Sequence, residues 1–221
     1  LSPLLSNLLL DELDRELERR QLHFVRYADD CNIYVASQRA GERVLTSITE
    51  FLAKRLRLKV NKEKSGVGKP WTRTFLGFDF LITKGKARIR LARKSRDRFQ
   101  KRVRELTRRA GGRSVDQVVT DLRKFLVGWY GYFQLSDVRN VFDRLDKWVR
   151  RRLRLYMWRQ WKTSTNRFSE LVARGCSTQL AASCAASQKS GWRIAASQGL
   201  SVALPNAYFR VLGIPTMGRS A

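Results

Sequence analysis

Two adjacent aspartates, Asp29 and Asp30, lie inside the stretch FVRYADDCNIYV, whose other residues mostly favour buried strands. Carboxylates side by side repel each other, and each costs free energy when it leaves water. One explanation is a solvated Asp-Asp turn, because aspartate favours turns. The other is a cation site, since hard divalent cations take carboxylate oxygens and offset their repulsion.

The elements around this pair follow from the periodicity of the apolar residues. LHFVRY and CNIYV predict two short strands, with the aspartates at or beside a tight turn. Leucines at helical spacing predict a helix to about Arg20, with Ser2 and Pro3 at its start. A second helix is expected over residues 42–58, followed by strands in TFLGFDFLI and ARIRL. The fold class is therefore α+β, a small antiparallel sheet with helices against it.

Strand patterns stop at Ser95, and three amphipathic helices are predicted after it, the second capped by Ser114 or Asp116. Short loops between such helices indicate an all-α helical bundle. The tail is rich in Ser, Ala and Gly but keeps enough apolar residues to pack as a short helical appendage. The expected domains are residues 1–92, 93–162 and 163–221.

The charge is strongly positive and regional. The 221 residues carry a formal charge of +26, and residues 84–162 supply +18 of it from 25 basic and 7 acidic residues. Such self-repulsion calls for a polyanionic partner, and nucleic acid is the first candidate. No run of about 18 apolar residues predicts a membrane span. Three cysteines without a C-x-x-C pair and a single histidine predict free thiols and no zinc cluster.

Four motifs in order carry a family resemblance: LSPLLSNLLLDELD, YADD, LRLKVNKEKS and FLGFDF. The series resembles the second half of a reverse transcriptase palm, specifically that of the group II intron family. The stretch LRKFLVGWYGYFQLSDVRNVFDRLDKWVRRRLRLYMWRQWK is similar to that family's maturase-specific thumb region. The resemblance covers about residues 1–162 well and the tail weakly. It implies a partial palm followed by a basic thumb and maturase bundle.

The resemblance implies an RNA-directed DNA polymerase with a two-magnesium site. Asp29 is then the first expected metal ligand and Asp30 the second, with Tyr27 and Ala28 under the primer end. Lys64 resembles the family lysine proposed near the pyrophosphate, where a cation could stabilise or protonate the leaving group. Lys64 could equally be an ordinary solvated loop lysine, and for the nearby Asn61 a loop cap is as much expected as a role in the site.

Further residues are expected to contact nucleic acid. FLGF resembles the primer grip, in which Gly77 would let the primer strand approach, although an ordinary core strand also explains it. Four cations share one helix face and could follow a phosphate backbone or simply be solvated: Arg144, Lys147, Arg151 and Arg154. The aromatic residues of the bundle are expected to be mostly core.

The resemblance also implies what is missing. The family's palm needs a third carboxylate on an earlier strand, and the chain opens with Leu1 inside a helical pattern, so we expect a piece of a longer protein. The two-metal Mg²⁺ site would be incomplete, and this polypeptide alone is expected to bind RNA without polymerising. Implied partners are structured intron RNA, an RNA–DNA primer–template duplex and dNTPs. The implied setting is a ribonucleoprotein of a mobile element in the bacterial cytoplasm, active in RNA processing.

Two alternatives remain. One is an RNA-binding splicing cofactor that has inherited polymerase residues without using them; the intact YADD argues for the enzyme, since such a cofactor has no reason to keep costly paired aspartates. The other is a reverse transcriptase of another lineage, such as a retron or a diversity-generating enzyme. GWYGYF together with WVRRRLR and WRQWK favours the intron family.

Overall fold

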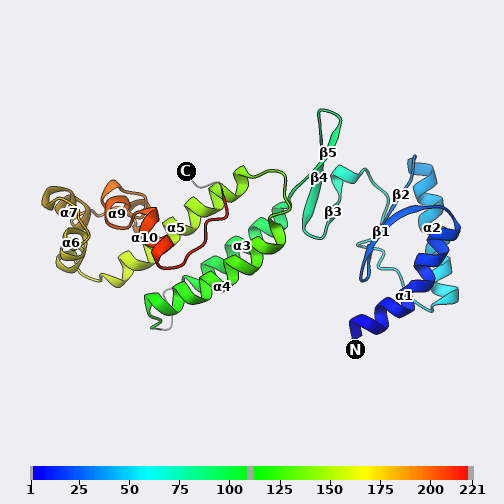
Figure 1. Cartoon of the computed structure of the whole chain (residues 1–221), viewed down its shortest axis with the longest axis horizontal. Coiled ribbons are helices and arrows are strands. Elements are labelled where there is room, and N and C mark those ends of the chain that lie inside the picture. Colours follow the sequence, from blue (N-terminus) through cyan, green and yellow to red (C-terminus); the bar gives the residue numbers. More distant parts are fainter. Residues whose placement is uncertain (1, 109–111, 219–221) are drawn as a thin grey trace. The chain divides into compact units, whose positions relative to one another are not determined.

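In a computed structural model, which describes residues 2–108 and 112–218, the chain forms two compact units, Leu1–Leu76 and Gly77–Ala221 (Figure 1). The first unit contains α1 (Ser2–Arg19), β1 (His23–Tyr27), β2 (Asp30–Tyr34), α2 (Gln38–Arg55), the 3-10 helix η1 (Pro70–Thr72) and β3 (Thr74–Phe75). The second contains β4 (Phe78–Thr83), β5 (Lys86–Leu91), α3 (Arg93–Leu106), α4 (Val115–Phe133), α5 (Asn140–Gln160), α6 (Ser164–Ala173), α7 (Thr178–Ala185), α8 (Gly191–Ile194), α9 (Gln198–Ala203) and α10 (Asn206–Val211). None of the helices in the described ranges is long and apolar enough to cross a membrane.

The first unit packs an antiparallel hairpin against two helices, which agrees with the α+β prediction. Its core consists of Leu13 and Leu17 from α1 and Ile48 from α2, with the inner face of β1 and β2 packed against them. Helix α1 ends at Arg19, one residue before the end at about Arg20 that its periodicity predicted. Helix α2 begins four residues before the predicted position, because Ser37 caps it by accepting a hydrogen bond from the Ala40 N–H.

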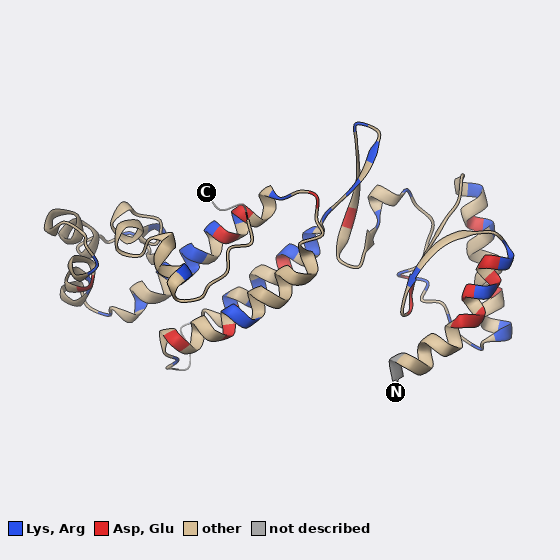
Figure 2. Ribbon diagram, in the orientation of Figure 1, with Lys and Arg blue, Asp and Glu red and all other residues tan. Residues whose placement is uncertain are grey.

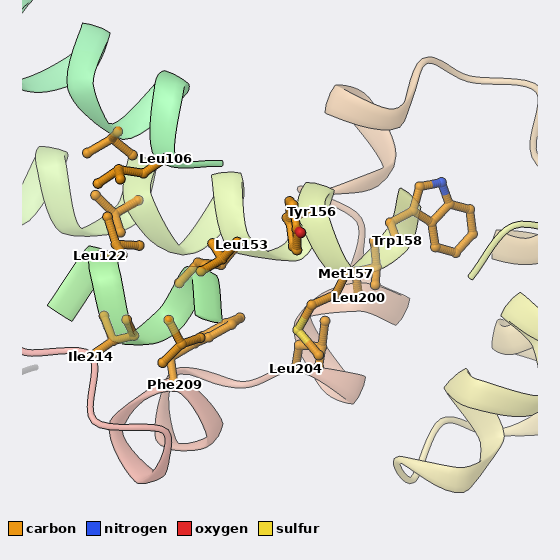
Figure 3. Close-up of a cluster of buried hydrophobic side chains, with 14 of the residues drawn as sticks. Leu106, Leu122, Leu153, Tyr156, Met157, Trp158, Leu200, Leu204, Phe209 and Ile214 are labelled. Carbon is orange, nitrogen blue, oxygen red and sulfur yellow. The ribbon is translucent and has the colours of Figure 1, made fainter. Parts of the chain in front are cut away.

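The second unit is built around the three predicted helices α3, α4 and α5. Their facing stripes form one apolar core, part of which Figure 3 shows. The most deeply buried side chains include Val103, Leu122, Leu126, Phe142 and Leu153. Ser114, the first of the two expected caps, begins α4 with a capping box in which Ser114 and Gln117 exchange hydrogen bonds. Local capping and burial of an apolar stripe together explain where α4 starts and which face it hides.

The tail forms the short helices α6 to α10, and they share the core of α5. Leu171, Leu200 and Phe209 are fully buried in that core. A buried ion pair on α5 also holds the C-terminal segment: Asp146 accepts hydrogen bonds from the N–H groups of Met217 and Gly218, at 3.0 and 2.9 Å. The expected helical appendage is therefore continuous with the bundle in packing.

The β4–β5 hairpin folds with the helices, so the compact second unit begins well before the expected boundary at residue 93. Asp137 ties the hairpin to the α4–α5 loop, since its carboxylate accepts from the Ile89 N–H at 2.7 Å and its own N–H donates to the Ile89 carbonyl at 2.9 Å. The Phe78 ring lies 5.3 Å from that of Phe133 on α4. A hairpin of this size has no core of its own and gains one from the helices.

Replacing Gly77 by alanine should destabilise the second unit. Gly77 has φ +80°, and a Cβ there would lie 2.7 Å from Ser95 Oγ and 3.0 Å from Phe133 Cε1. We expect a loss of roughly 1–3 kcal/mol in the free energy of unfolding, from backbone strain and overpacking combined. Urea unfolding followed by tryptophan fluorescence measures it.

Gly85→Ala is the matched control, because Gly85 also has positive φ but no atom lies within 4 Å of the place that a Cβ would take. It should lose only the backbone part, about 1 kcal/mol. Equal losses for the two variants would show that the contacts with Ser95 and Phe133 do not matter.

Candidate active site and nucleic-acid interface

The aspartate pair lies at the end of the β1–β2 hairpin, as the sequence predicted. Tyr27 pairs with Asp30 in the last register position, so Ala28 and Asp29 form a two-residue turn. Ala28 has φ +53°, a value that two-residue hairpin turns require and that glycine normally supplies. A non-glycine residue there costs about 1 kcal/mol. The surrounding structure must therefore hold this turn in place.

Both carboxylates are exposed. Within residues 2–108 and 112–218, neither the Asp29 nor the Asp30 carboxylate has a hydrogen-bond or ion-pair partner, although the chain has 45 basic residues. Two hard oxygen donors on a short hairpin suit Mg²⁺ or Mn²⁺. Yet the described part of the chain brings together no group of three or more His, Cys, Asp or Glu residues that could hold a metal ion. The two carboxylates are therefore suitable ligands for a divalent cation, but only as part of a larger set of ligands.

The outer face of the hairpin surrounds the pair with exposed side chains. Because strand residues alternate between faces, Val25 and Tyr27 lie on the same face as Asp30. Val25 is 49% exposed and Tyr27 is 64% exposed. Tyr27 is thus accessible to a ligand next to Asp30, which is where the family resemblance puts the primer end. Its contact with a primer stays a prediction.

The inner face carries an arginine that the sequence analysis missed. Arg26 donates from Nε to Asp14 Oδ1 on α1 at 2.7 Å, and its Nη2 donates to the other oxygen of Asp14. Its Nη1 donates to the Ala28 carbonyl at 2.9 Å and to Asn7 Oδ1 at 3.1 Å. The hydrogen bond to Asp14 raises the pKa of Arg26. The sequence feature that could have revealed Arg26 is its position: it is a charged residue on the inward face of a strand, two residues after the packed Phe24.

Cys31 also faces inward and packs on the core of the first unit. Burial, followed by the nearby Asp14 carboxylate, raises the pKa of its thiol to about 11. The thiol therefore stays protonated near neutral pH, which makes it a poor nucleophile. Cys31 is a packing residue beside the aspartate pair.

The loop after α2 shows Asn61 as a cap, which was one of its two expected roles. Its Oδ1 accepts from the N–H groups of Glu63 and Lys64, at 3.0 and 3.2 Å. The Lys64 side chain is exposed and has no partner among the described residues. A role of Lys64 at a pyrophosphate stays a prediction. Contact between Gly77 and a primer also stays a prediction, because the positive φ of Gly77 and its close packing against Ser95 already explain why glycine occupies this position.

The predicted basic face of α5 is divided in two by the fold. Arg144 and Lys147 are exposed and have no partner within the described ranges. Arg151 donates two hydrogen bonds to the Trp192 carbonyl, at 2.7 and 3.1 Å, and its guanidinium lies 4.1 Å from the centre of that ring. Arg154 donates to the Leu204 carbonyl at 3.0 Å. These two arginines hold the C-terminal helices, and their phosphate contacts stay a prediction.

A second basic face lies on α3, and the sequence analysis did not single it out. Lys94, Arg98 and Lys101 follow one another at helical spacing, and all three are exposed without a partner in the described chain. Figure 2 shows the contrast between the charged helices α3 and α5 and the mostly uncharged helices after them. Lys86 and Arg88 add exposed cations on β5. The signal was the run RKSRDRFQKRVRE itself, in which only two residues are acidic.

Comparison with protein families assigns the class. Residues 1–80 match the family model of reverse transcriptase (RNA-dependent DNA polymerase), and this match contains the hairpin with Asp29 and Asp30. Residues 96–175 match the maturase-specific domain of group II introns, which extends past residue 162 into the helix α6. The chain therefore belongs to the group II intron reverse transcriptase and maturase family, as the motifs predicted. No match to a curated protein was found.

Neutralising the aspartate pair should leave the fold intact. Asp29→Asn and Asp30→Asn remove exposed, unpartnered charges, so the free energy of unfolding should stay within about 0.5 kcal/mol of the wild type. Asp14→Ala is the contrast in the same unit. It leaves the guanidinium of Arg26 without its ion partner and should cost roughly 1–3 kcal/mol. Urea unfolding by far-ultraviolet circular dichroism checks both; a large loss in the asparagine variants would mean that the pair is structural.

Proposed function

We propose that the chain supplies part of the nucleotidyl-transfer site and the nucleic-acid-binding thumb of a group II intron reverse transcriptase that also acts as a maturase. The observation that carries the proposal is a pair of exposed, unpartnered carboxylates at a tight turn, inside the segment that matches reverse transcriptases. Its expected setting is a ribonucleoprotein in the bacterial cytoplasm.

In this proposal, Asp29 and Asp30 hold divalent cations with their carboxylate oxygens. When bound, two Mg²⁺ ions lower the pKa of a primer 3′-hydroxyl and neutralise the triphosphate and its leaving group. The hairpin keeps the carboxylates on a short and rigid support, so they need little reorganisation when a cation arrives. Tyr27 and Ala28 lie next to the pair in sequence and would form the surface under the primer end.

Lys64 is the proposed cation for the pyrophosphate. Its ammonium group could donate a hydrogen bond or a proton to a phosphate oxygen as negative charge develops there. The exposed side chain is available for this role, and the Asn61 cap orders the loop that carries it. Incoming dNTPs are the corresponding substrates.

The second unit is proposed to bind the RNA or the RNA–DNA duplex. Duplexes of A-form are recognised mostly through phosphates and 2′-hydroxyls, which suits a row of cations on a rigid helix. Lys94, Arg98 and Lys101 on α3 are the best candidates, since Arg151 and Arg154 on α5 are already engaged with backbone carbonyls. Arg144 and Lys147 are the remaining candidates on α5.

Neutralising the cations on α3 should weaken RNA binding and make it less dependent on salt concentration. We expect the variant Lys94→Gln/Arg98→Gln/Lys101→Gln to lower the slope of log K against log salt by about 2 to 3, since each lost phosphate contact contributes roughly one. Fluorescence anisotropy with a labelled structured RNA at several salt concentrations measures it. As a control, Lys189→Gln/Arg193→Gln/Arg210→Gln removes the same charge from exposed positions in the C-terminal part of the second unit. Equal changes in both triple variants would contradict the assignment to α3.

The 221-residue chain alone is proposed to bind RNA without extending a primer, because two carboxylates without a third should hold the catalytic metals poorly. Incubation with oligo(dT) on poly(rA), dTTP and Mg²⁺ should give no product, while the same preparation binds RNA. Primer extension above background that disappears in Asp29→Ala would overturn this part of the proposal.

A splicing cofactor without polymerase activity is the second candidate, favoured by the match to the maturase-specific domain. The aspartate pair separates the two candidates. In the cofactor, RNA affinity and splicing assistance should not depend on Asp29 and Asp30, and no divalent cation should bind them.

A further inference from the structure

We infer that Arg26 and Asp14 are positioning residues that fix the turn carrying the candidate metal ligands. This inference rests on the proposed function, in which Asp29 and Asp30 bind divalent cations. It assigns the rigidity of the site to a particular side chain on the inner face of β1, which does not itself touch the reacting groups. The backbone of the turn is the element through which it acts.

The geometry of the guanidinium carries the argument. Asp14 occupies Nε and Nη2 of Arg26, which fixes the plane of the guanidinium relative to α1. The remaining Nη1 reaches the Ala28 carbonyl at 2.9 Å and Asn7 Oδ1 at 3.1 Å. Asn7 and Asp14 are seven residues apart and therefore share one face of α1. The Arg26 side chain thus connects two positions along α1, Asn7 and Asp14, to the hairpin turn.

The atom that Arg26 holds is the one that orients Asp29. The Ala28 carbonyl belongs to the peptide plane that joins Ala28 to Asp29, so fixing it limits the direction in which the Asp29 side chain leaves the backbone. Ala28 also has a strained φ of +53°, and a turn of this kind keeps its conformation only when its surroundings impose it. The neighbouring like charges of Asp29 and Asp30 add a further tendency to separate.

Packing alone does not explain an arginine here. The side chains of Arg26 and Asp14 are 12% and 24% exposed, and the inner face beside them is apolar. An apolar pair of similar size would usually serve stability as well or better, because charges lose their hydration on burial. Only a long, forked donor reaches both the helix and the turn. Lysine keeps the charge but presents a single nitrogen and cannot fix the same plane.

The test compares Arg26→Lys with Arg20→Lys in the 221-residue chain. Arg20 is a matched control, because its guanidinium also connects α1 to another element of the first unit, through Glu16 on α1 and Ser47 on α2, but does not contact the turn. Two measurements are made: amide hydrogen exchange at residues 28–30, and Mn²⁺ affinity by electron paramagnetic resonance. Arg26→Lys should speed exchange at the turn about tenfold and weaken Mn²⁺ binding at least about fivefold, while Arg20→Lys changes neither by more than about twofold.

The outcomes test the positioning role of Arg26 and metal binding by Asp29 and Asp30 separately. Unchanged turn exchange in Arg26→Lys, or equal changes in Arg20→Lys, would overturn the positioning role. If the wild type binds Mn²⁺ no better than Asp29→Asn/Asp30→Asn, the metal-binding proposal fails, and exchange at the turn still tests the clamp. Should Arg26→Lys not fold, Asp14→Asn replaces it, since asparagine keeps one acceptor for Arg26 but loses the ionic pair. Faster exchange confined to the turn supports the role.

Discussion

The hydrogen bonds of one guanidinium group join the candidate active site to the rest of its unit. Arg26 contacts α1 through Asp14 and the hairpin turn through the Ala28 carbonyl, so the position of the turn depends on the position of the helix. The core below it, formed by Leu13, Leu17 and Ile48, sets where α1 lies. A short hairpin is marginally stable by itself, and burial of its inner face supplies what local pairing does not.

The attachment of the turn to α1 also explains how the two aspartate carboxylates can remain without hydrogen-bond or ion-pair partners in the described chain. Unpaired carboxylates cost little when they remain in water, and the turn keeps both side chains exposed while Phe24, Cys31 and Ile33 on the inner face of the strands are packed. Free energy of folding therefore comes from Phe24, Ile33 and their neighbours, and the exposed carboxylates remain available to a cation. Stability and ligand binding are carried by opposite faces of the hairpin.

In the second unit, α5 has the corresponding central position. Its apolar stripe contacts α3, α4 and the terminal helices, so its cations are drawn into contacts with the chain itself. Arg150 pairs with Asp146, Arg152 donates to Thr107 Oγ1, and Arg151 and Arg154 bind carbonyls of the tail. Helix α3 packs through a narrower stripe and leaves more of its cations in solvent. The high charge of the chain thus divides into structural arginines and an exposed basic surface.

The sequence by itself determined the helices α1 to α5, both hairpins, the turn with its two aspartates and the family, because periodicity, capping and short motifs are local properties. It could not decide that β4 and β5 fold with the helices, since Asp137 and Phe133 are distant in sequence from the strands they hold. Nor could it distinguish Arg144, which stays in solvent, from Arg151, which reaches a tail carbonyl: both occupy the same face of one helix. Arg26 was likewise hidden, because its partners on α1 are brought to it only by the packing of the hairpin on that helix. Long-range contacts determine which charged side chains stay in solvent and which bind other parts of the chain. Only the tertiary structure decides this.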